Sequence, residues 1–209
     1  MDLKIPFRYY HSAFSEDECN SIINIGKGKI NKAFIDTDQN TPTLDESVRN
    51  CEVSWLNEPW IYEKIYAAIL DTNEKAGWKW NIDCIELLQF TKYGLNEHYD
   101  WHCDGFSDFL GIYKNNPVEQ YNGKVRKISV TVNLVDGNEY EGGDLLFSDP
   151  KYLNKDFGIL GEKQPYTINE IRNKGTIIVF PSFTYHKVTP VTRGTRYSLV
   201  TWALGNPWQ

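Results

Sequence analysis

The chain has 209 residues, of which 41% are hydrophobic and 14% aromatic, and its formal net charge is −6 at pH 7. This composition is typical of a globular protein, and the length predicts a single domain, residues 1–209, with a core of its own. The negative charge argues against a broad phosphate-binding surface, so no nucleic-acid partner is expected. No apolar run is long enough to span a membrane, and the first residues lack the apolar core of a signal peptide. We therefore expect a cytoplasmic protein without a membrane partner, and the four scattered cysteines fit reduced thiols in that compartment.

The N-terminal part predicts a strand or arm over residues 1–10, followed by a helix. Ser15 and Glu18 have the spacing of a capping box, in which each side chain binds the backbone of the other residue. The helix should end near Gly26 or Gly28, because glycine favours the C-terminal cap. Three isoleucines are expected to face inward: Ile22, Ile23 and Ile25.

A polar, aperiodic stretch over residues 35–50 predicts a long loop, which we interpret as either a lid or a disordered segment. A strand should follow over residues 49–55. Pro59 then precedes a helix over residues 60–75, with isoleucines at helical spacing. Residues 14–80 would therefore form a helical support for whatever follows.

From about residue 83 to 204 the sequence predicts several short strands separated by Gly and Pro turns. The expected fold is mainly β with flanking helices (α+β), with a double-stranded β-helix, or jelly roll, as its core. The strand over residues 126–136 alternates apolar and polar residues, and the basic residues near its start (Lys124, Arg126 and Lys127) are interpreted as a solvated strand edge. No role follows from the sequence for residues 106–123 or 148–174.

The most informative motif is His102-Cys103-Asp104. On an extended strand, residues two apart point to the same side, so His102 and Asp104 would converge while Cys103 points away. An imidazole and a carboxylate are two of the three ligands in the facial triad that binds non-haem Fe(II). A three-residue motif also arises by chance, and a structural histidine is the competing interpretation.

His186 is the candidate for the third ligand, because it opens a β-rich segment after a buried strand and a Pro-Ser turn. Ten residues later, Arg196 and Ser198 fall on one face of a strand over residues 196–202. A guanidinium beside a hydroxyl is a good receptor for a buried carboxylate, because it offers two parallel donors and a third one next to them.

Together these features resemble the Fe(II)/2-oxoglutarate dioxygenases, and most closely their prolyl 4-hydroxylase alpha-subunit-like group. The resemblance covers residues 85–204 well. Its matching segments are Tyr93-Gly94 and residues 99–104, 126–134, 141–145 and 180–196. Two positions depart from the prolyl hydroxylase pattern: many of these enzymes have Lys where this chain has Arg196, and several have Tyr near Asn133.

The resemblance implies that His102, Asp104 and His186 bind Fe(II), and that Arg196 and Ser198 bind the distal carboxylate of 2-oxoglutarate. It also implies that 2-oxoglutarate and O2 are consumed while a substrate C–H bond is hydroxylated, with ascorbate as a possible reductant. Tyr93, Thr131 and Asn133 would line the co-substrate pocket. The implied substrate is a prolyl residue in a peptide or protein, and proline-rich sequences are among the candidates.

Other functions stay open at this point. A free amino acid or another small molecule is the alternative substrate. A zinc hydrolase could use the same three ligands with a bound water, although Arg196 and Ser198 would then have no role. A non-catalytic jelly-roll binding module would need Arg196 to lie outside any pocket shared with the three ligands.

Overall fold

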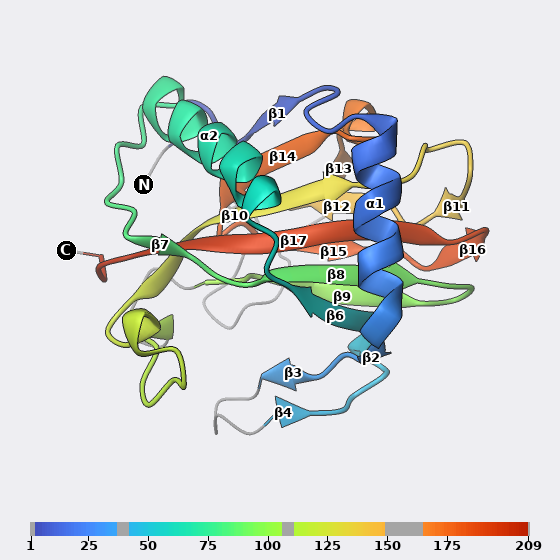
Figure 1. The fold of residues 1–209 in the computed structure, drawn as a ribbon, viewed down its shortest axis with the longest axis horizontal. Helices are drawn as coiled ribbons and strands as arrows, with labels where there is room; N and C mark the ends of the chain where they lie inside the picture. The colour runs from blue at the N-terminus through green and yellow to red at the C-terminus, as the bar shows by residue number, and fades with distance from the viewer. Residues whose placement is uncertain (1–2, 37–41, 106–110, 149–164, 209) are drawn as a thin grey trace.

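The computed structural model describes residues 3–36, 42–105, 111–148 and 165–208. Its strands form two antiparallel sheets that face each other, and both α-helices of the described residues lie on the outer side of the larger sheet (Figure 1). This arrangement is a jelly roll with flanking helices, as the sequence predicts.

The larger sheet, or major sheet, has eight described strands, seven of them in the order β1-β14-β10-β17-β8-β6-β2, while β7 pairs with one end of β17. All of its pairings are antiparallel. The bounds are β1 Arg8–Tyr10, β2 Asn31–Lys32, β6 Glu52–Leu56, β7 Cys84–Ile85, β8 Leu88–Tyr93, β10 Val125–Asn133, β14 Ile177–Pro181 and β17 Arg196–Gly205.

The smaller sheet, or minor sheet, has five described strands in the order β13-β12-β15-β9-β5 and runs behind the major sheet in Figure 1. Its strands are β5 Arg49–Asn50, β9 His98–His102, β12 Leu145–Phe147, β13 Tyr166–Thr167 and β15 His186–Val188. Two short hairpins complete the described strands: β3 Ile35–Asp36 with β4 Pro42–Thr43, and β11 Glu141–Gly142 with β16 Val191–Arg193. Short 3-10 helices lie at Lys27–Lys29, Glu119–Tyr121 and Asn169–Arg172.

Helix α1 spans Glu16–Gly26 and has the predicted capping box. The Glu18 amide donates to Ser15 Oγ at 3.2 Å, and the Ser15 amide donates to the Glu18 carboxylate at 2.8 Å. The helix ends at Gly26, where a Cβ atom would lie 2.3 Å from the Phe90 ring, so only glycine lets the helix sit this close to the sheet. The prediction for Ile25 was wrong: its side chain is 41% exposed, because Gly26 rather than Ile25 faces the strands.

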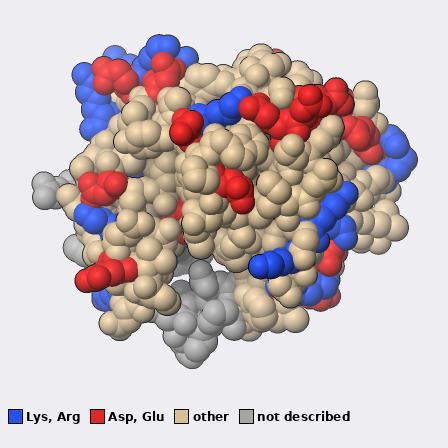
Figure 2. Space-filling model, in the orientation of Figure 1, with Lys and Arg blue, Asp and Glu red and all other residues tan. Residues whose placement is uncertain are grey.

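Helix α2 spans Pro59–Lys75, with Pro59 in its first turn as predicted. Its isoleucines Ile61, Ile65 and Ile69 are buried against the outer face of the major sheet. On the face of the molecule that carries the two helices, the described basic side chains are interspersed with acidic ones (Figure 2).

The major sheet has two different faces. On β10, Ile128, Val130 and Val132 belong to the apolar core under the helices. The alternate residues of that strand point the other way, into the space between the two sheets, and are Ser129, Thr131 and Asn133. A second apolar core closes part of this inner space around Phe147, Ile178 and Phe180. The polar face of β10 therefore lines the interior of the jelly roll rather than facing water.

The structure differs from three local predictions. The stretch over residues 35–50 contains the β3–β4 hairpin and β5 rather than one loop, and the part of the predicted lid over residues 37–41 lies outside the described residues. The predicted strand over residues 49–55 is two strands in different sheets, because the chain crosses from the minor to the major sheet at Cys51. The predicted core strand over residues 83–93 is interrupted between β7 and β8.

The region predicted as helical support, residues 14–80, also contributes β2 and β6 to the major sheet and β5 to the minor one. In the part of the chain that the structure describes, no helix is both long and apolar enough to cross a membrane.

Candidate functional site

Two histidines and an aspartate converge on the minor sheet. His102 and His186 are directly opposite each other on the neighbouring strands β9 and β15. Asp104 follows β9, and its backbone amide donates to the Ser182 carbonyl at 2.9 Å. One ligand atom from each of the three side chains lies within 4.8 Å of the other two. Asp104 Oδ1 is 3.7 Å from His102 Nε2, and Asp104 Oδ2 is 3.6 Å from His186 Nε2.

Both imidazoles are held in the orientation that a metal ligand needs. The Nδ1 atom of His102 is 2.8 Å from the Asp100 carbonyl, and that of His186 is 2.8 Å from the Thr184 carbonyl. A carbonyl only accepts, so each Nδ1 donates, and each Nε2 keeps a lone pair directed toward Asp104. Burial, together with the neighbouring imidazole, lowers the pKa of His102 to about 3, so this ring is neutral near pH 7.

Asp104 is held as a carboxylate. Burial by itself would raise its pKa, but the imidazoles of His186 and His102 and the Arg126 guanidinium outweigh burial and lower the pKa to about 2. Ser129 Oγ on β10 donates to Asp104 Oδ2 at 2.7 Å, which links the carboxylate to the major sheet. Two imidazoles whose Nε2 atoms face one oriented carboxylate form a donor set that fits Fe(II).

Arg196 opens β17, opposite Tyr93 at the end of β8. Its side chain is buried, with Cζ 5.5 Å from the Tyr93 ring centroid and one nitrogen 3.5 Å from Ser198 Oγ. Within the described residues no carboxylate lies within 4.0 Å of this guanidinium. Burial raises the pKa of Tyr93, so this phenol is neutral and cannot neutralise the arginine. A buried cation without a counter-ion is costly, and a bound anion would offset that cost.

A small cavity between the sheets borders the Arg196 side chain, and both Thr131 and Asn133 line it. Thr131 lies opposite Ile178 and Val200 in the ladders of β10, and its side chain is buried beside the cavity. The Asn133 amide nitrogen donates to the Val135 and Arg172 carbonyls, at 2.6 Å each, so both of its N–H groups are used. Asn133 therefore lines the cavity, as predicted for the co-substrate pocket, but both of its amide N–H groups anchor the neighbouring backbone.

The triad and the cavity lie side by side on the inner faces of the sheets. On β10, Ser129 contacts Asp104 and Thr131 lines the cavity. On β14, Phe180 meets the His186 ring with centroids 5.0 Å apart, and Ile178 lines the cavity. Residues two apart on a strand are separated by about 7 Å. A small molecule can therefore reach from the three ligands toward Arg196.

The sequence did not predict two groups beside the triad. Arg49 lies over the Tyr99 ring at 4.7 Å, and Tyr99 in turn stacks on the His102 ring with centroids 3.6 Å apart. The alternation of β5 and β9 gives no sign of this stack, because it depends on how the two strands pair.

The second group contains Arg126, which donates to both oxygens of the buried Glu86 at 2.6 and 2.8 Å and lies 3.7 Å above the centroid of the Trp202 ring. The prediction of a solvated strand edge was therefore wrong for Arg126, and also for Lys127, which is only 4% exposed. The sequence did contain one signal for this group. The alternation of β17 places Trp202 on the same side of the strand as Val200, which is the inner side.

The remaining histidines lie apart from the triad, since His98 binds backbone carbonyls and His11 packs on Tyr9. A jelly roll with two imidazoles and a carboxylate between its sheets, next to a buried arginine, is typical of non-haem Fe(II) oxygenases.

Comparison with known proteins agrees with this class. Residues 88–204 match the 2OG-Fe(II) oxygenase superfamily, so the chain belongs to this superfamily. Membership implies Fe(II), 2-oxoglutarate and O2. A PKHD-type hydroxylase of Xylella fastidiosa is 31% identical over 115 residues, which are 54% of this chain and 42% of the relative. The chain thus spans less than half the length of the curated relatives it matches.

Two solved structures share the fold. A viral collagen prolyl hydroxylase from Paramecium Bursaria Chlorella virus-1, in complex with 2-oxoglutarate, has a TM-score of 0.58 and 20% identity, and the match covers 97% of each chain. A prolyl hydroxylase from Trichoplax adhaerens, in complex with a peptide fragment of hypoxia inducible factor, has a TM-score of 0.62 and 15% identity over 96% of this chain and 84% of that one. At these identities the likeness concerns the fold.

Proposed function

We propose that this chain is an Fe(II)- and 2-oxoglutarate-dependent dioxygenase that hydroxylates a prolyl residue in a peptide or protein. The observation that carries the co-substrate assignment is the buried Arg196 guanidinium, which has no carboxylate partner within the described residues and faces the same interior as the three candidate ligands. A dicarboxylate that binds a metal at one end and Arg196 at the other satisfies both groups.

His102, Asp104 and His186 would hold Fe(II) through two Nε2 atoms and one carboxylate oxygen. When bound, the iron supplies the O2 activation that couples decarboxylation of 2-oxoglutarate to hydroxylation of a C–H bond, with ascorbate as a reductant. Ser129 keeps the carboxylate oriented, and the Nδ1 hydrogen bonds keep both Nε2 atoms directed at the metal position. His102, with a pKa of about 3, and Asp104, with a pKa of about 2, are both deprotonated near pH 7.

Arg196 and Ser198 would bind the distal carboxylate of 2-oxoglutarate, with Tyr93 beside the guanidinium and Thr131 offering a hydroxyl from β10. The protein's contribution is to orient this co-substrate and to keep water away from the metal, which the buried strands on both sides favour.

The peptide substrate is supported by the relatives. One structural neighbour was solved with a peptide fragment, and the sequence relative from Xylella is named a hydroxylase. The Trp202 ring lies beside Asp104 but is buried under the Arg126 guanidinium, so it supports the site and does not itself argue for a prolyl substrate. A free amino acid or another small molecule is the second candidate, because the departures at Arg196 and Asn133 separate this chain from the prolyl hydroxylase pattern.

The co-substrate assignment is tested by Arg196→Ala. Removing one partner of a buried charge pair costs about 2–5 kcal/mol, so 2-oxoglutarate should bind at least about thirtyfold more weakly. Anaerobic calorimetry with the Mn(II)-loaded protein measures this. Arg196→Lys should recover part of the loss, since it restores the charge but not the planar fork. Mn(II) affinity should not change.

The control is Arg193→Ala, which removes an exposed arginine three residues away that pairs with Glu141. An Arg196→Ala affinity within threefold of the unmutated protein would contradict the assignment.

The substrate is tested by succinate formation with Fe(II), 2-oxoglutarate and a panel of proline-containing peptides, each compared with its Pro→Ala counterpart and with free amino acids. Stimulation by a peptide, lost with its alanine counterpart, supports the prolyl substrate. Stimulation by a free amino acid alone supports the second candidate. Hydrolysis that depends on zinc, with no succinate, would instead favour a hydrolase.

A further inference from the structure

The cavity beside Arg196 contains a hydroxyl without a partner. Thr176 precedes β14, and its side chain is 1% exposed and lines this cavity. Its Oγ1 atom has no hydrogen-bond partner within the described residues. Burying a hydroxyl without a partner destabilises a folded protein, so an unpaired hydroxyl in a native site calls for an explanation. A ligand that accepts a hydrogen bond in the cavity provides one.

A second hydroxyl enters the same cavity from a different element. Tyr140 lies in the connection between β10 and β11, is 2% exposed, and lines the cavity. Its hydroxyl is 3.5 Å from Asn133 Oδ1, which is long for a hydrogen bond between two oxygens. The Tyr140 hydroxyl therefore gains little from this contact and is available as a donor to a better acceptor.

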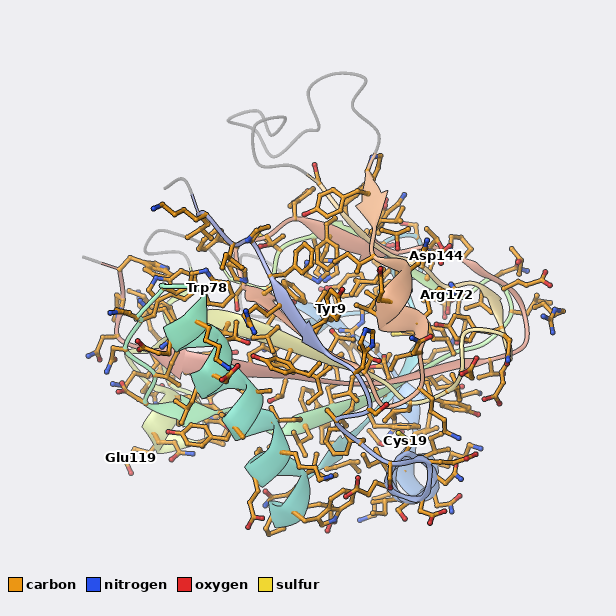
Figure 3. The ribbon with its side chains drawn as sticks, turned by 90° about the horizontal axis from the view of Figure 1, so that it is seen from above. Tyr9, Cys19, Trp78, Glu119, Asp144 and Arg172 are labelled. Carbon is orange, nitrogen blue, oxygen red and sulfur yellow. The ribbon has the colours of Figure 1, made fainter. Side chains whose placement is uncertain are left out.

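The surrounding backbone is built to hold Tyr140 at this place. Arg172 lies over the Tyr140 ring at 4.3 Å and donates to the carbonyls of Tyr140, Gly137 and Gly142 at 3.0–3.1 Å. The Arg172 side chain also pairs with Asp144, and the two lie side by side in Figure 3. Both terminal nitrogens of Arg172 are thus bound to residues 137–144 around Tyr140, in contrast to those of Arg196.

Gly143 allows the close approach of the two groups. Its φ is +61°, and a Cβ atom there would lie 3.1 Å from Arg196 Cδ and 3.4 Å from the Tyr140 ring. A side chain at this position would be strained and would stand against both residues. The glycine lets the tyrosine ring and the arginine border one cavity.

We propose that the hydroxyls of Tyr140 and Thr176 donate to the same carboxylate that Arg196 binds, and that they set the preference of the site for a co-substrate with a distal carboxylate. This inference rests on the proposed function, because the carboxylate in question is that of 2-oxoglutarate. A carboxylate has lone pairs for the guanidinium and for both hydroxyls. Hydrogen bonds to a charged group are stronger than those between neutral groups, so both hydroxyls contribute to selectivity.

The test compares two ligands on two nearly isosteric variants, Tyr140→Phe and Thr176→Val, by anaerobic calorimetry with Mn(II)-loaded protein. 2-Oxoglutarate carries the distal carboxylate, and 2-oxopentanoate has the same chain length without it. Each variant should bind 2-oxoglutarate about tenfold more weakly, the loss expected for one hydrogen bond to a charged group. Neither variant should bind 2-oxopentanoate more weakly than the unmutated protein does.

Thermal unfolding of the ligand-free variants separates this role from a structural one. Thr176→Val removes an unpaired buried hydroxyl, so its Tm should stay the same or rise. The matched control Thr72→Val removes a buried hydroxyl that is bonded to Tyr10 at 2.8 Å, so its Tm should fall while 2-oxoglutarate affinity is kept. Tyr121→Phe is the control for Tyr140→Phe, because Tyr121 is also buried and has a hydroxyl contact of 3.5 Å, with the Ile85 carbonyl.

Each outcome decides a different point. If both variants bind 2-oxoglutarate within twofold of the unmutated protein, or lose the two ligands equally, the inference is overturned while the proposed function stands. A change in one variant alone removes the other residue from the site. If the unmutated protein binds no 2-oxoglutarate, the proposed function fails, and this inference fails with it.

Discussion

The two faces of the major sheet differ in what surrounds their buried side chains. On the outer face, Ile128, Val130 and Val132 pack against α1 and α2 in an apolar core. On the inner face, Arg196, Ser198 and the polar residues of β10 are buried to a similar degree. The same strands therefore carry an apolar core on one side and a polar interior on the other.

Two arginines on the inner side show what this difference means. Arg172 has a carboxylate partner and three backbone carbonyls, and it organises the connection around Tyr140. Arg196 is more deeply buried, and its one side-chain hydrogen bond within the described residues, to Ser198, is long. A charged side chain whose hydrogen-bonding partners are all present stabilises the fold. A buried charged side chain that lacks such partners is explained by a ligand that supplies them. Substitutions on the outer face should therefore change the free energy of unfolding, and those on the inner face should change binding.

The largest expected effect is on the inner side, at Asp104. Asp104→Ala removes the charged member of the candidate metal site, so Mn(II) binding and succinate formation should both be lost. The fold should persist, because the variant leaves the apolar core untouched. Metal titration and a turnover assay measure the effect. The control is Asp100→Ala on the preceding strand β9, whose exposed side chain is 3.9 Å from Lys187 and should not matter. Full metal occupancy with full turnover in Asp104→Ala would mean that the triad is misassigned.

On the outer face, Ile128→Ala should lower the free energy of unfolding by about 2–5 kcal/mol, because it leaves a cavity under the helices. Urea unfolding measures this loss. Ile128→Val should cost about 0.5–1.5 kcal/mol. The protein that remains folded should bind 2-oxoglutarate normally, since Ile128 points away from the site. A loss of affinity at unchanged stability would show that the two faces are not separate.

The alternation of β10 is interrupted at Lys127, where the pairing with β17 shifts between Arg126 and Ile128. Burial lowers the pKa of Lys127 from 10.5 to about 8. The unfolded chain therefore binds more protons than the folded chain between these two pKa values, and stability should rise with pH across that window. Lys127→Met should remove this rise and raise the Tm at pH 7. The contact of the Lys127 amine with the Trp208 ring at 3.4 Å, which the variant loses, reduces the gain.

Thermal unfolding between pH 7 and 10.5 measures the effect of Lys127→Met. The control is Lys124→Met, which removes an amine that is paired with Asp83 and should leave the pH dependence in place. An unchanged pH dependence in Lys127→Met would show that the buried amine is not its source.

The smallest expected effect lies outside both faces, at the start of α1. Ser15→Ala removes the capping hydroxyl and should cost about 1 kcal/mol. Ser21→Ala on the exposed side of the same helix should cost nothing, because alanine has the higher helix propensity. Urea unfolding of the two variants gives the comparison, and equal stabilities would show that the cap contributes little. Co-substrate affinity should be the same in both.

The sequence by itself determined the features that depend on neighbours along the chain. The capping box at Ser15, the helix after Pro59 and the alternation of β10 follow from local spacing, and all three are present. The convergence of His102 and Asp104 also follows from the period of a strand. These features need no knowledge of what packs against them.

Only the tertiary structure decided which strands pair and what the inner face encloses. The crossing between sheets at Cys51, the exposure of Ile25 and the use of the Asn133 amide by two carbonyls all depend on residues distant in sequence. Tyr140 and Thr176 carry no motif, and they come together with Arg196 because β10, β14 and β17 are adjacent in the major sheet. Strand periodicity specifies the face on which a side chain lies, but the register between strands specifies its neighbours, and that register is set by long-range packing.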